Sequence, residues 1–175
     1  MSKRGLLIGR FQPFHIGHSK GIEQIIKEMD ELIILIGSAQ DSHSLNNPFT
    51  AGERIRMIHE ALIENNSNLS KFYIIPLADT NDNRIWVAHL VSSVPPFDVV
   101  YTHNPLVKRL LIESNYLVKS HKFYDRDTYN ATEVRKRMFN NDNWEELVPK
   151  SVARIIKEIS GIDRINQIGD TILKH

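Results

Sequence analysis

The chain has 175 residues, 41% of them hydrophobic, and its 22 basic and 21 acidic residues leave a formal net charge of +1. This near-neutral balance argues against a nucleic-acid-binding protein, the absence of cysteine excludes disulfides and thiolate chemistry, and no apolar stretch reaches the length of a membrane span. We therefore expect one globular domain over residues 1–175, soluble and cytoplasmic, with no nucleic-acid or membrane partner.

Strand-like and helix-like patterns alternate along the first two thirds of the chain. Strands are expected at 5–8, 31–37, 72–77 and 98–101, with a weaker pair near 116–118 and 121–123. Helices are expected at about 17–29, 51–64, 83–92 and 105–113. This alternation predicts βαβ units and a doubly wound parallel α/β sheet with helices on both faces.

The last part of the chain, about residues 131–175, has a helical pattern throughout. Helices are expected at 131–139, 150–159 and 162–173, with a turn near Trp144, which we interpret as a structural residue. We expect these C-terminal helices to belong to the same domain as the sheet.

Polar segments follow each of the first four predicted strands, at 9–18, 38–50, 78–86 and 102–105. Ligands of an open parallel sheet bind beyond the carboxyl ends of its strands, where the strand order reverses. We therefore expect these segments to meet at one crevice.

The segment 9–18, Gly-Arg-Phe-Gln-Pro-Phe-His-Ile-Gly-His, connects the first strand to the first helix. A helix start offers unpaired N–H donors and partial positive charge, and Arg10, His15 and His18 add further donors. Gly17 lets the backbone approach an anion without a side chain in the way. Zinc would also suit two histidines, but no nearby carboxylate or cysteine completes a ligand set. A polyphosphate site is the better interpretation, although either histidine alone would be an ordinary surface or core residue.

A second helix start lies at residues 130–135. Asn130 is placed as the N-cap and Glu133 at the reciprocal position of a capping box. Thr132 then lies in the first turn and Arg135 one turn further, so this start is a second candidate anion site. Without the first segment, a capped surface helix would be the simpler interpretation.

Trp86 follows a polar loop after the third strand. Large aromatic residues usually belong to the core, but a position at the carboxyl edge of the sheet favours stacking on a flat ring. In the segment before the second helix, Glu53 is best explained as a cap. Lys108 and Arg109 are expected on a solvated helix face.

Four segments resemble one family, in order, over roughly residues 4–140. They are 9–18, 47–54 (Asn-Pro-Phe-Thr-Ala-Gly-Glu-Arg), 104–107 (Asn-Pro-Leu-Val) and 132–135 (Thr-Glu-Val-Arg). The first has the histidine motif that the nucleotidyltransferase superfamily shares with class I aminoacyl-tRNA synthetases, but the chain is too short for the tRNA-binding parts. The full set resembles the archaeal-type nicotinamide-mononucleotide adenylyltransferases, which implies a Rossmann-like sheet.

The resemblance implies adenylyl transfer from ATP to nicotinamide mononucleotide, giving NAD and pyrophosphate. It implies catalytic roles for Arg10, His15, His18 and Arg135. It implies ATP contacts from Gly9, Phe11, Gly17, Asn104 and Thr132, and acceptor contacts from Phe49, Arg54, Asn83 and Trp86, with Trp86 stacked on the nicotinamide. Asn130 departs from the family pattern, where relatives commonly have serine.

The resemblance also implies Mg²⁺ carried by the ATP phosphates, without a metal site made by the protein, and a homo-oligomer, commonly a hexamer. Two other functions stay open. One is nucleotide transfer to another phosphorylated acceptor, such as phosphopantetheine or flavin mononucleotide. The other is a nucleotide-binding sensor without turnover.

Overall fold

Five parallel strands form the central sheet of the computed structural model, which describes residues 2–122, 124–125 and 127–173. They are β1 (Arg4–Gly9), β2 (Glu31–Ile36), β3 (Phe72–Pro76), β4 (Val99–Tyr101) and β5 (Val118–Lys119), in the order β3-β2-β1-β4-β5. Because β1 lies in the middle and later strands are added on both sides, the strand order reverses between β1 and β4. The predicted Rossmann-like, doubly wound α/β fold is confirmed.

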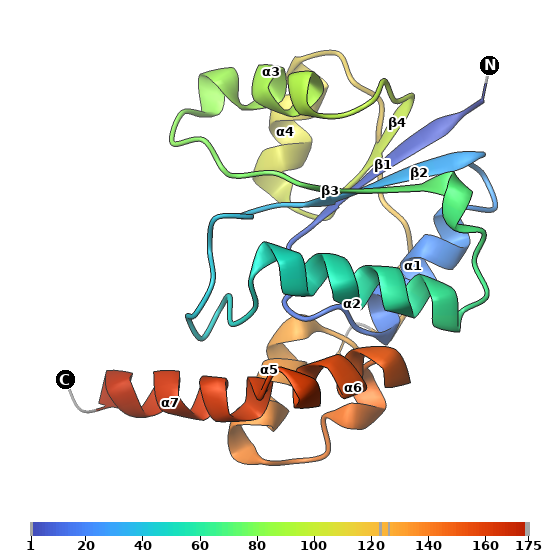
Figure 1. The fold of residues 1–175 in the computed structure, drawn as a ribbon. Coiled ribbons are helices and arrows are strands. Elements are labelled where there is room, and N and C mark those ends of the chain that lie inside the picture. The colour runs from blue at the N-terminus through green and yellow to red at the C-terminus, as the bar shows by residue number, and fades with distance from the viewer. Residues whose placement is uncertain (1, 123, 126, 174–175) are drawn as a thin grey trace.

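Helices cover both faces of this sheet (Figure 1). One face carries α1 (Ile16–Ile25) and α2 (Ala51–Glu64), and the other carries α3 (Asn83–Ser93) and α4 (Pro105–Glu113). Strands buried on both faces are continuous apolar runs, and residues 32–36 of β2 are all buried. The α2 helix begins at the predicted capping box, in which the Glu53 carboxylate accepts the Thr50 N–H at 2.9 Å.

Two expected elements differ from those found. The first helix ends at Ile25 rather than near residue 29, yet Met29 is 3% exposed and packs in the same core, so its apolar spacing reflected burial beyond the helix end. The weak strands near 116–118 and 121–123 are represented by the two-residue β5, which pairs only with the short β4. Residues 121 and 122 lie in no strand, and residue 123 lies outside the described part.

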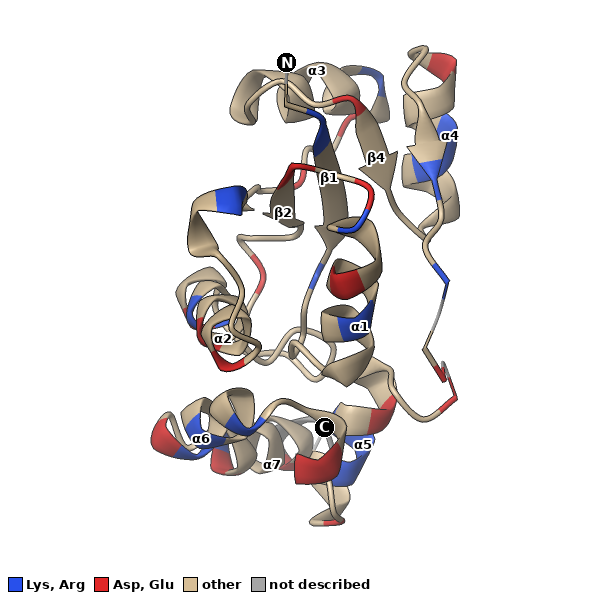
Figure 2. Ribbon diagram, turned by 90° about the vertical axis from the view of Figure 1, so that its right-hand side faces the viewer, with Lys and Arg blue, Asp and Glu red and all other residues tan. Residues whose placement is uncertain are grey.

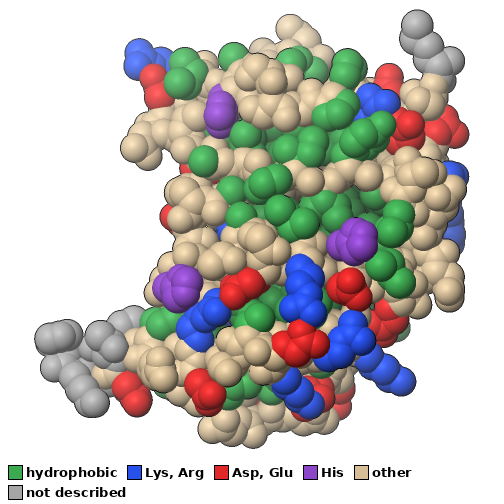
Figure 3. Space-filling model, in the orientation of Figure 1, with side chains coloured by type: hydrophobic (Ala, Val, Ile, Leu, Met, Phe, Trp, Pro, Cys, Tyr) green, Lys and Arg blue, Asp and Glu red, His purple; other side chains and the backbone are tan. Residues whose placement is uncertain are grey.

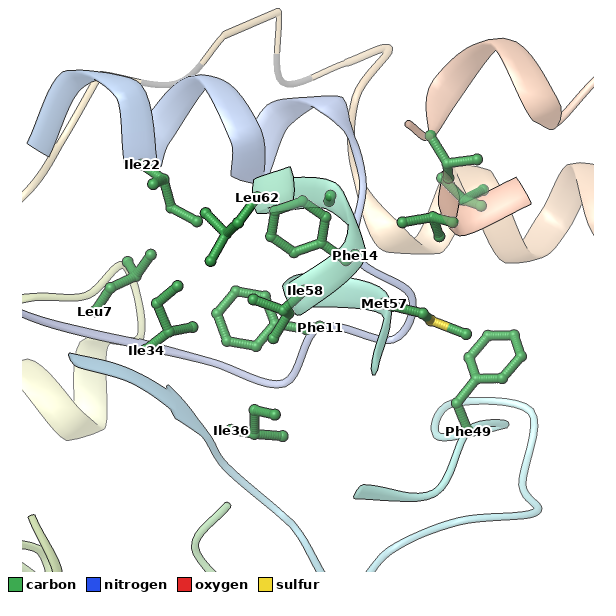
Figure 4. Packing of buried hydrophobic residues seen from close by; sticks show 14 of the residues in the cluster. Leu7, Phe11, Phe14, Ile22, Ile34, Ile36, Phe49, Met57, Ile58 and Leu62 are labelled. Atoms are coloured by element: carbon green, nitrogen blue, oxygen red, sulfur yellow. The ribbon is translucent and has the colours of Figure 1, made fainter. Parts of the chain in front are cut away.

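The C-terminal helices pack below α2 and share its core (Figure 1). They are α5 (Ala131–Asn140), α6 (Lys150–Glu158) and α7 (Gly161–Leu173), with the 3-10 turn η2 (Glu145–Leu147) after Trp144; a similar turn, η1 (Leu69–Lys71), precedes β3. The side chains of Phe11 and Phe14 point into this core towards Ile58 of α2 (Figure 4). Burial of Trp144, which is 6% exposed, agrees with its interpretation as a structural residue.

Successive residues of β1 serve two different cores, because strand side chains alternate between faces. Leu7 belongs to the large core under α1 and α2, whereas Leu6 belongs to a smaller core under α3 and α4, which also contains Trp86. Each of the strands β1 to β4 therefore contributes side chains to both the large core and the smaller core.

The surface has charges of both signs and an apolar area near one sheet edge. Lys, Arg, Asp and Glu are interspersed along α5, α6 and α7 (Figure 2). On the face in Figure 3, hydrophobic side chains gather where the edge strand β3 runs, and Tyr73 of that strand is 36% exposed. Within the described residues, no helix has the length and apolarity needed to cross a membrane.

Candidate active site

A cleft of about 470 Å³ lies at the carboxyl ends of the strands. Its walls come from the segments after the first four strands, and the segment after β5 and the start of α5 close one side. They include Gly9, Arg10, Phe11, His15, Gly17, His18, Ser38, Asp79, Trp86, His103, Asn104, His121, Asn130 and Arg135. The convergence expected from the parallel sheet is therefore present, and the cleft has the size of a typical small-molecule site.

His15 and His18 form a stacked pair at the start of α1. His15 is the N-cap, with extended backbone angles, and the two ring centroids are 3.6 Å apart. The backbone N–H of His15 donates to His18 Nδ1 at 3.2 Å. A neutral His18 ring therefore carries its proton on Nε2, where it can donate to a ligand.

Both imidazoles are neutral at pH 7 in the ligand-free protein. Burial, and then the positive charge of Arg135, lower the pKa of His15 to about 3. Burial also places the pKa of His18 well below its usual value, with further contributions from His15 and His121. His15 Nδ1 is buried and has no hydrogen-bond partner among the described residues. The pair thus offers hydrogen-bond donors in a dry environment rather than two fixed charges.

Arg10 and Arg135 supply the positive charge of the cleft. Arg135 Nη1 donates to the carbonyl of Gln12 at 2.8 Å, and Arg10 Nη1 donates to Asn47 Oδ1 at 3.4 Å. Burial, and then the charge of Arg10, lower the pKa of Arg135 to about 10, so it remains cationic at pH 7. Among the arginines that the structure describes, only these two and Arg54 form no ion pair with a carboxylate. Two guanidinium charges therefore remain available to an anion in the cleft.

The second helix start lies directly against the first. Asn130 Oδ1 accepts the backbone N–H of Glu133 at 2.8 Å, which confirms Asn130 as the N-cap of α5. A Cβ on Gly17 would lie 2.9 Å from the Tyr129 carbonyl oxygen. The glycine is therefore needed for close approach of the two helix starts, besides any approach of an anion. Thr132 is exposed and is not part of the cleft wall; its Oγ1 accepts from Arg135 Nη2 at 3.4 Å.

The other residues expected to contact ATP have clear local roles in the wall of the cleft. Asn104 is the N-cap of α4, and its Oδ1 accepts the N–H groups of Leu106 and Val107. Phe11 has φ 53°, uncommon for a bulky residue, and its ring lies within van der Waals reach of Gly9. A Cβ on Gly9 would be 2.9 Å from that ring, so the turn requires glycine there.

The four residues expected on the acceptor side occupy very different environments. Trp86 forms part of the cleft wall and is 9% exposed, with much of its ring in the smaller core. Asn83, the first residue of α3, is exposed and lies outside the lining of the cleft.

Phe49 and Arg54 do not line the cleft in this structure, and their substrate contacts stay predictions. Phe49 is 0% exposed and packs in the large core. Arg54 is also 0% exposed, and its guanidinium donates to six backbone carbonyls, those of Arg10, Gly37, Ser38, Ala39, Asp41 and Thr50. Arg54 therefore holds the loops beneath the cleft, a role that sequence motifs alone do not separate from ligand binding.

Several cleft residues were not anticipated. His103 and His121 pack edge to face, with ring centroids 4.4 Å apart, and the His121 ring covers Gly21 of α1. His103 stands in the polar segment after β4, so the sheet-edge argument could have found it. His121 follows a two-residue strand with little sequence signal. Gln12 and Asp79 also line the wall.

The described side chains do not form a metal cage. No group of three or more His, Cys, Asp or Glu residues that could hold a metal ion occurs among them. The donor set of the cleft, made of imidazoles, guanidiniums and helix N-termini, instead suits an anion.

Comparisons with known proteins identify the family of the chain. The model of the cytidylyltransferase-like family matches residues 6–137. A nicotinamide-nucleotide adenylyltransferase of Archaeoglobus fulgidus is 54% identical over 168 residues, covering 94% of this chain and 97% of the relative. A protein of the same name from Halobacterium salinarum is 51% identical, covering 96% of this chain and 93% of the relative.

A solved structure shares the fold. It is the bifunctional NMN adenylyltransferase/ADP ribose pyrophosphatase from Francisella tularensis, complexed with AMP and a Mn ion, with a TM-score of 0.83 and 24% identity. The match covers 99% of this chain and 54% of that structure, so the chain spans about half its length. The family match and the two archaeal relatives go further than this likeness of fold: the chain belongs to the cytidylyltransferase-like family and, within it, to the archaeal nicotinamide-nucleotide adenylyltransferases.

Proposed function

We propose that the chain transfers the adenylyl group of ATP to nicotinamide mononucleotide, forming NAD and pyrophosphate in NAD biosynthesis. One observation supports this most directly. Two helix starts, two neutral imidazoles and two guanidiniums without carboxylate partners line a single cleft at the switch point of the sheet. Such a cleft is built for a polyphosphate, and the names of the close relatives indicate which reaction uses it.

The reaction needs positioning more than acid–base chemistry. An oxygen of the acceptor's 5′-phosphate attacks the α-phosphorus of ATP and forms the new P–O bond. The bond from the α-phosphorus to the bridging oxygen breaks, and its electron pair leaves with pyrophosphate. Because the attacking phosphate is already an anion, no strong general base and no covalent enzyme intermediate are required.

Negative charge grows on the leaving pyrophosphate, and the protein donors stabilise it. We assign this role to the His18 Nε2–H, His15, Arg10 and Arg135. Each charge-assisted hydrogen bond contributes about 1.5–3 kcal/mol. A bound polyphosphate also raises the pKa of both imidazoles from their low ligand-free values, because an adjacent anion favours the protonated form.

The two nucleotides are proposed to occupy opposite halves of the cleft. ATP contacts are assigned to Gly9, Phe11, Gly17 and Asn104, and to Thr132 through the N-terminus of α5. The mononucleotide is placed on the side of Trp86 and Asn83, with its ring against the exposed part of the indole. Asn83, the first residue of α3, is assigned to the same side.

Mg²⁺ is proposed to arrive with ATP, held by phosphate oxygens and water. This assignment follows from the ion's preference for oxygen ligands and retained water, and from the absence of a three-residue cage among the described side chains. The residues of the cleft then act on the phosphates directly.

We further propose a cytoplasmic homo-oligomer, with the hexamer as the expected form. The exposed apolar side chains around edge strand β3, including Tyr73, support an interface there (Figure 3). Light scattering of the purified protein at several concentrations measures the mass; a monomer at every concentration would contradict this proposal.

The decisive assay is pyrophosphate release with ATP against nicotinamide mononucleotide, its acid form, flavin mononucleotide and phosphopantetheine, with product identified by mass. We expect dinucleotide only with the nicotinamide or nicotinic acid acceptor. Turnover with another acceptor alone would reassign the substrate. Binding of ATP without pyrophosphate release from any acceptor would favour a sensor.

A further inference from the structure

Arg164 of α7 lies outside the cleft and holds the loop that precedes α2. Its guanidinium makes two parallel bonds to the Glu53 carboxylate, at 2.7 and 2.8 Å, and a third to the Pro48 carbonyl at 3.1 Å. Both side chains of the ion pair are 19% exposed. Such a bidentate, mostly buried pair fixes orientation as well as distance.

The loop at 47–50 is connected to both cleft arginines, directly to Arg10 and through Gln12 to Arg135. Asn47 Oδ1 accepts from Arg10. The Gln12 side chain bonds both backbone groups of Phe49, donating to its carbonyl at 2.8 Å and accepting its N–H at 2.9 Å. The carbonyl of Gln12 in turn accepts from Arg135.

The two bonds between Gln12 and Phe49 are buried, so the 47–50 loop and the turn that contains Gln12 are expected to move together. Gln12 is 1% exposed and Phe49 is 0% exposed. Separating them would leave buried backbone donors and acceptors unsatisfied, which is costly. A displacement of the loop at its Arg164 side is therefore transmitted to Gln12 and to Arg135.

The α7 helix also touches the element that carries Arg135. Phe139 of α5 packs against Gly169 of α7, and the Phe49 ring lies against Gly161 at the start of α7. The α7 helix therefore contacts both the helix that carries Arg135 and the 47–50 loop that bonds to Gln12 and Arg10.

We propose that Arg164 is a positioning residue for adenylyl transfer, acting through Glu53 and Pro48 on the loop that sets Arg10 and Arg135. The inference rests on the proposed function, because it assigns a geometric role within that site. Arg164 itself touches neither the cleft wall nor the phosphates.

The test compares Arg164→Ala, Arg164→Lys and Arg154→Ala. Arg154 is the matched control, since it also joins a C-terminal helix to α2, through Glu60, but contacts nothing in the 47–50 loop. All variants are assayed at one temperature, well below the lowest Tm of the set, so that every variant is fully folded in the assay.

We expect Arg164→Ala to lower kcat/KM about tenfold, as small misplacements of catalytic groups do. Arg164→Lys keeps a positive charge opposite Glu53 but loses the two parallel bonds, so its loss should be intermediate. Arg154→Ala should stay within about twofold of the unmodified protein. The NMR signals of the Gln12 side-chain amide should shift in Arg164→Ala and stay unchanged in Arg154→Ala.

A fall in Tm with unchanged kcat, KM and Gln12 signals would make Arg164 merely structural and overturn the proposal. Failure of the unmodified protein to form dinucleotide would instead overturn the proposed function. ATP affinity by calorimetry then decides the positioning role separately: it should weaken in Arg164→Ala relative to Arg154→Ala, and equal affinities would reject the role.

Discussion

His18 shows how one ring can serve the fold with one nitrogen and a ligand with the other. Its Nδ1 accepts the His15 N–H at 3.2 Å, which completes the start of α1, and its Nε2–H is the donor that we propose binds a phosphate. The sequence motif predicted the presence of both histidines at the helix start, whereas the division of work between the nitrogens depends on the ring orientation.

His18→Asn separates these two functions. The asparagine Oδ1 lies where Nδ1 was and can keep the bond to the His15 N–H, but no donor reaches the position of Nε2. We expect kcat to fall about 10²- to 10³-fold, as for loss of one transition-state donor, with a change in stability below about 1 kcal/mol. His59→Ala, on an exposed histidine of α2, is the control. Similar losses of stability and activity in His18→Asn would identify a structural histidine.

The buried imidazoles also make stability depend on pH. Between the unfolded pKa near 6.5 and the folded pKa of His15 at about 3, the unfolded chain binds a proton that the folded chain does not. Stability is therefore lost as the pH falls below about 6.5, by up to about 1.4 kcal/mol per pH unit for this residue.

Urea unfolding from pH 7 to 4 measures this effect. The curve of unfolding free energy against pH for His15→Gln should be flatter than that of the unmodified protein over this range, because one proton-linked group is removed. The carboxylates titrate in both proteins, so the difference isolates His15. Parallel curves would show that His15 is not buried in its neutral form.

Burial separates the predicted site residues that line the cleft from those that do not. Arg10, His15, His18, Trp86 and Arg135 line it, because each lies just beyond a strand end or in the first turns of a helix. Phe49 and Arg54 stand in an equally polar segment, but the loop folds back so that they lie beneath it. A motif predicts that a residue lies near the cleft, but the packing of the loop determines whether its side chain points into the cleft or into the core.

At the scale of elements, the starts of α1 and α5 are packed directly against each other. Capping residues and apolar periodicity predicted most helix limits, because these signals lie within the helix sequence itself. The end of α1 and the short β5 did not, because the turn after Ile25 and the pairing with β4 depend on the rest of the sheet. The contact between α1 and the Tyr129 carbonyl is equally non-local.

Gly17→Ala tests this contact. Its Cβ would lie 2.9 Å from a backbone oxygen that cannot rotate away, so the helix starts must move apart. We expect a loss of about 1–3 kcal/mol in stability and a clear fall in kcat/KM. Gly52→Ala is the matched control, since nothing lies within 4 Å of its Cβ, and it should be neutral or stabilise α2 by up to about 1 kcal/mol. Equal effects of the two substitutions would contradict the close contact.

For the whole molecule, the question is whether the C-terminal helices form one domain with the sheet, as we propose. The large core contains Leu7 and Ile34 of the sheet together with Ile155 and Ile165 of α6 and α7. The smaller core uses the opposite faces of the same strands. Loss of either core therefore exposes strands that the other one needs.

The two tryptophans allow a direct test, because each reports on a different core. Trp86 lies in the smaller core and Trp144 in the large one, beside the C-terminal helices. Each of the variants Trp144→Phe and Trp86→Phe keeps one indole. Within each variant, the fluorescence of that indole and the far-UV circular dichroism should have the same urea midpoint, because a single domain unfolds in one step. In Trp144→Phe, saturating ATP should raise the urea midpoints of Trp86 fluorescence and of far-UV circular dichroism by the same amount. Ligand binding to the folded state stabilises the whole cooperative unit. If the Trp144 fluorescence of Trp86→Phe changed at a much lower urea concentration than the Trp86 fluorescence of Trp144→Phe, the segment from 131 would be a separate unit. The support that Arg164 gives to the cleft would then be lost before the sheet unfolds.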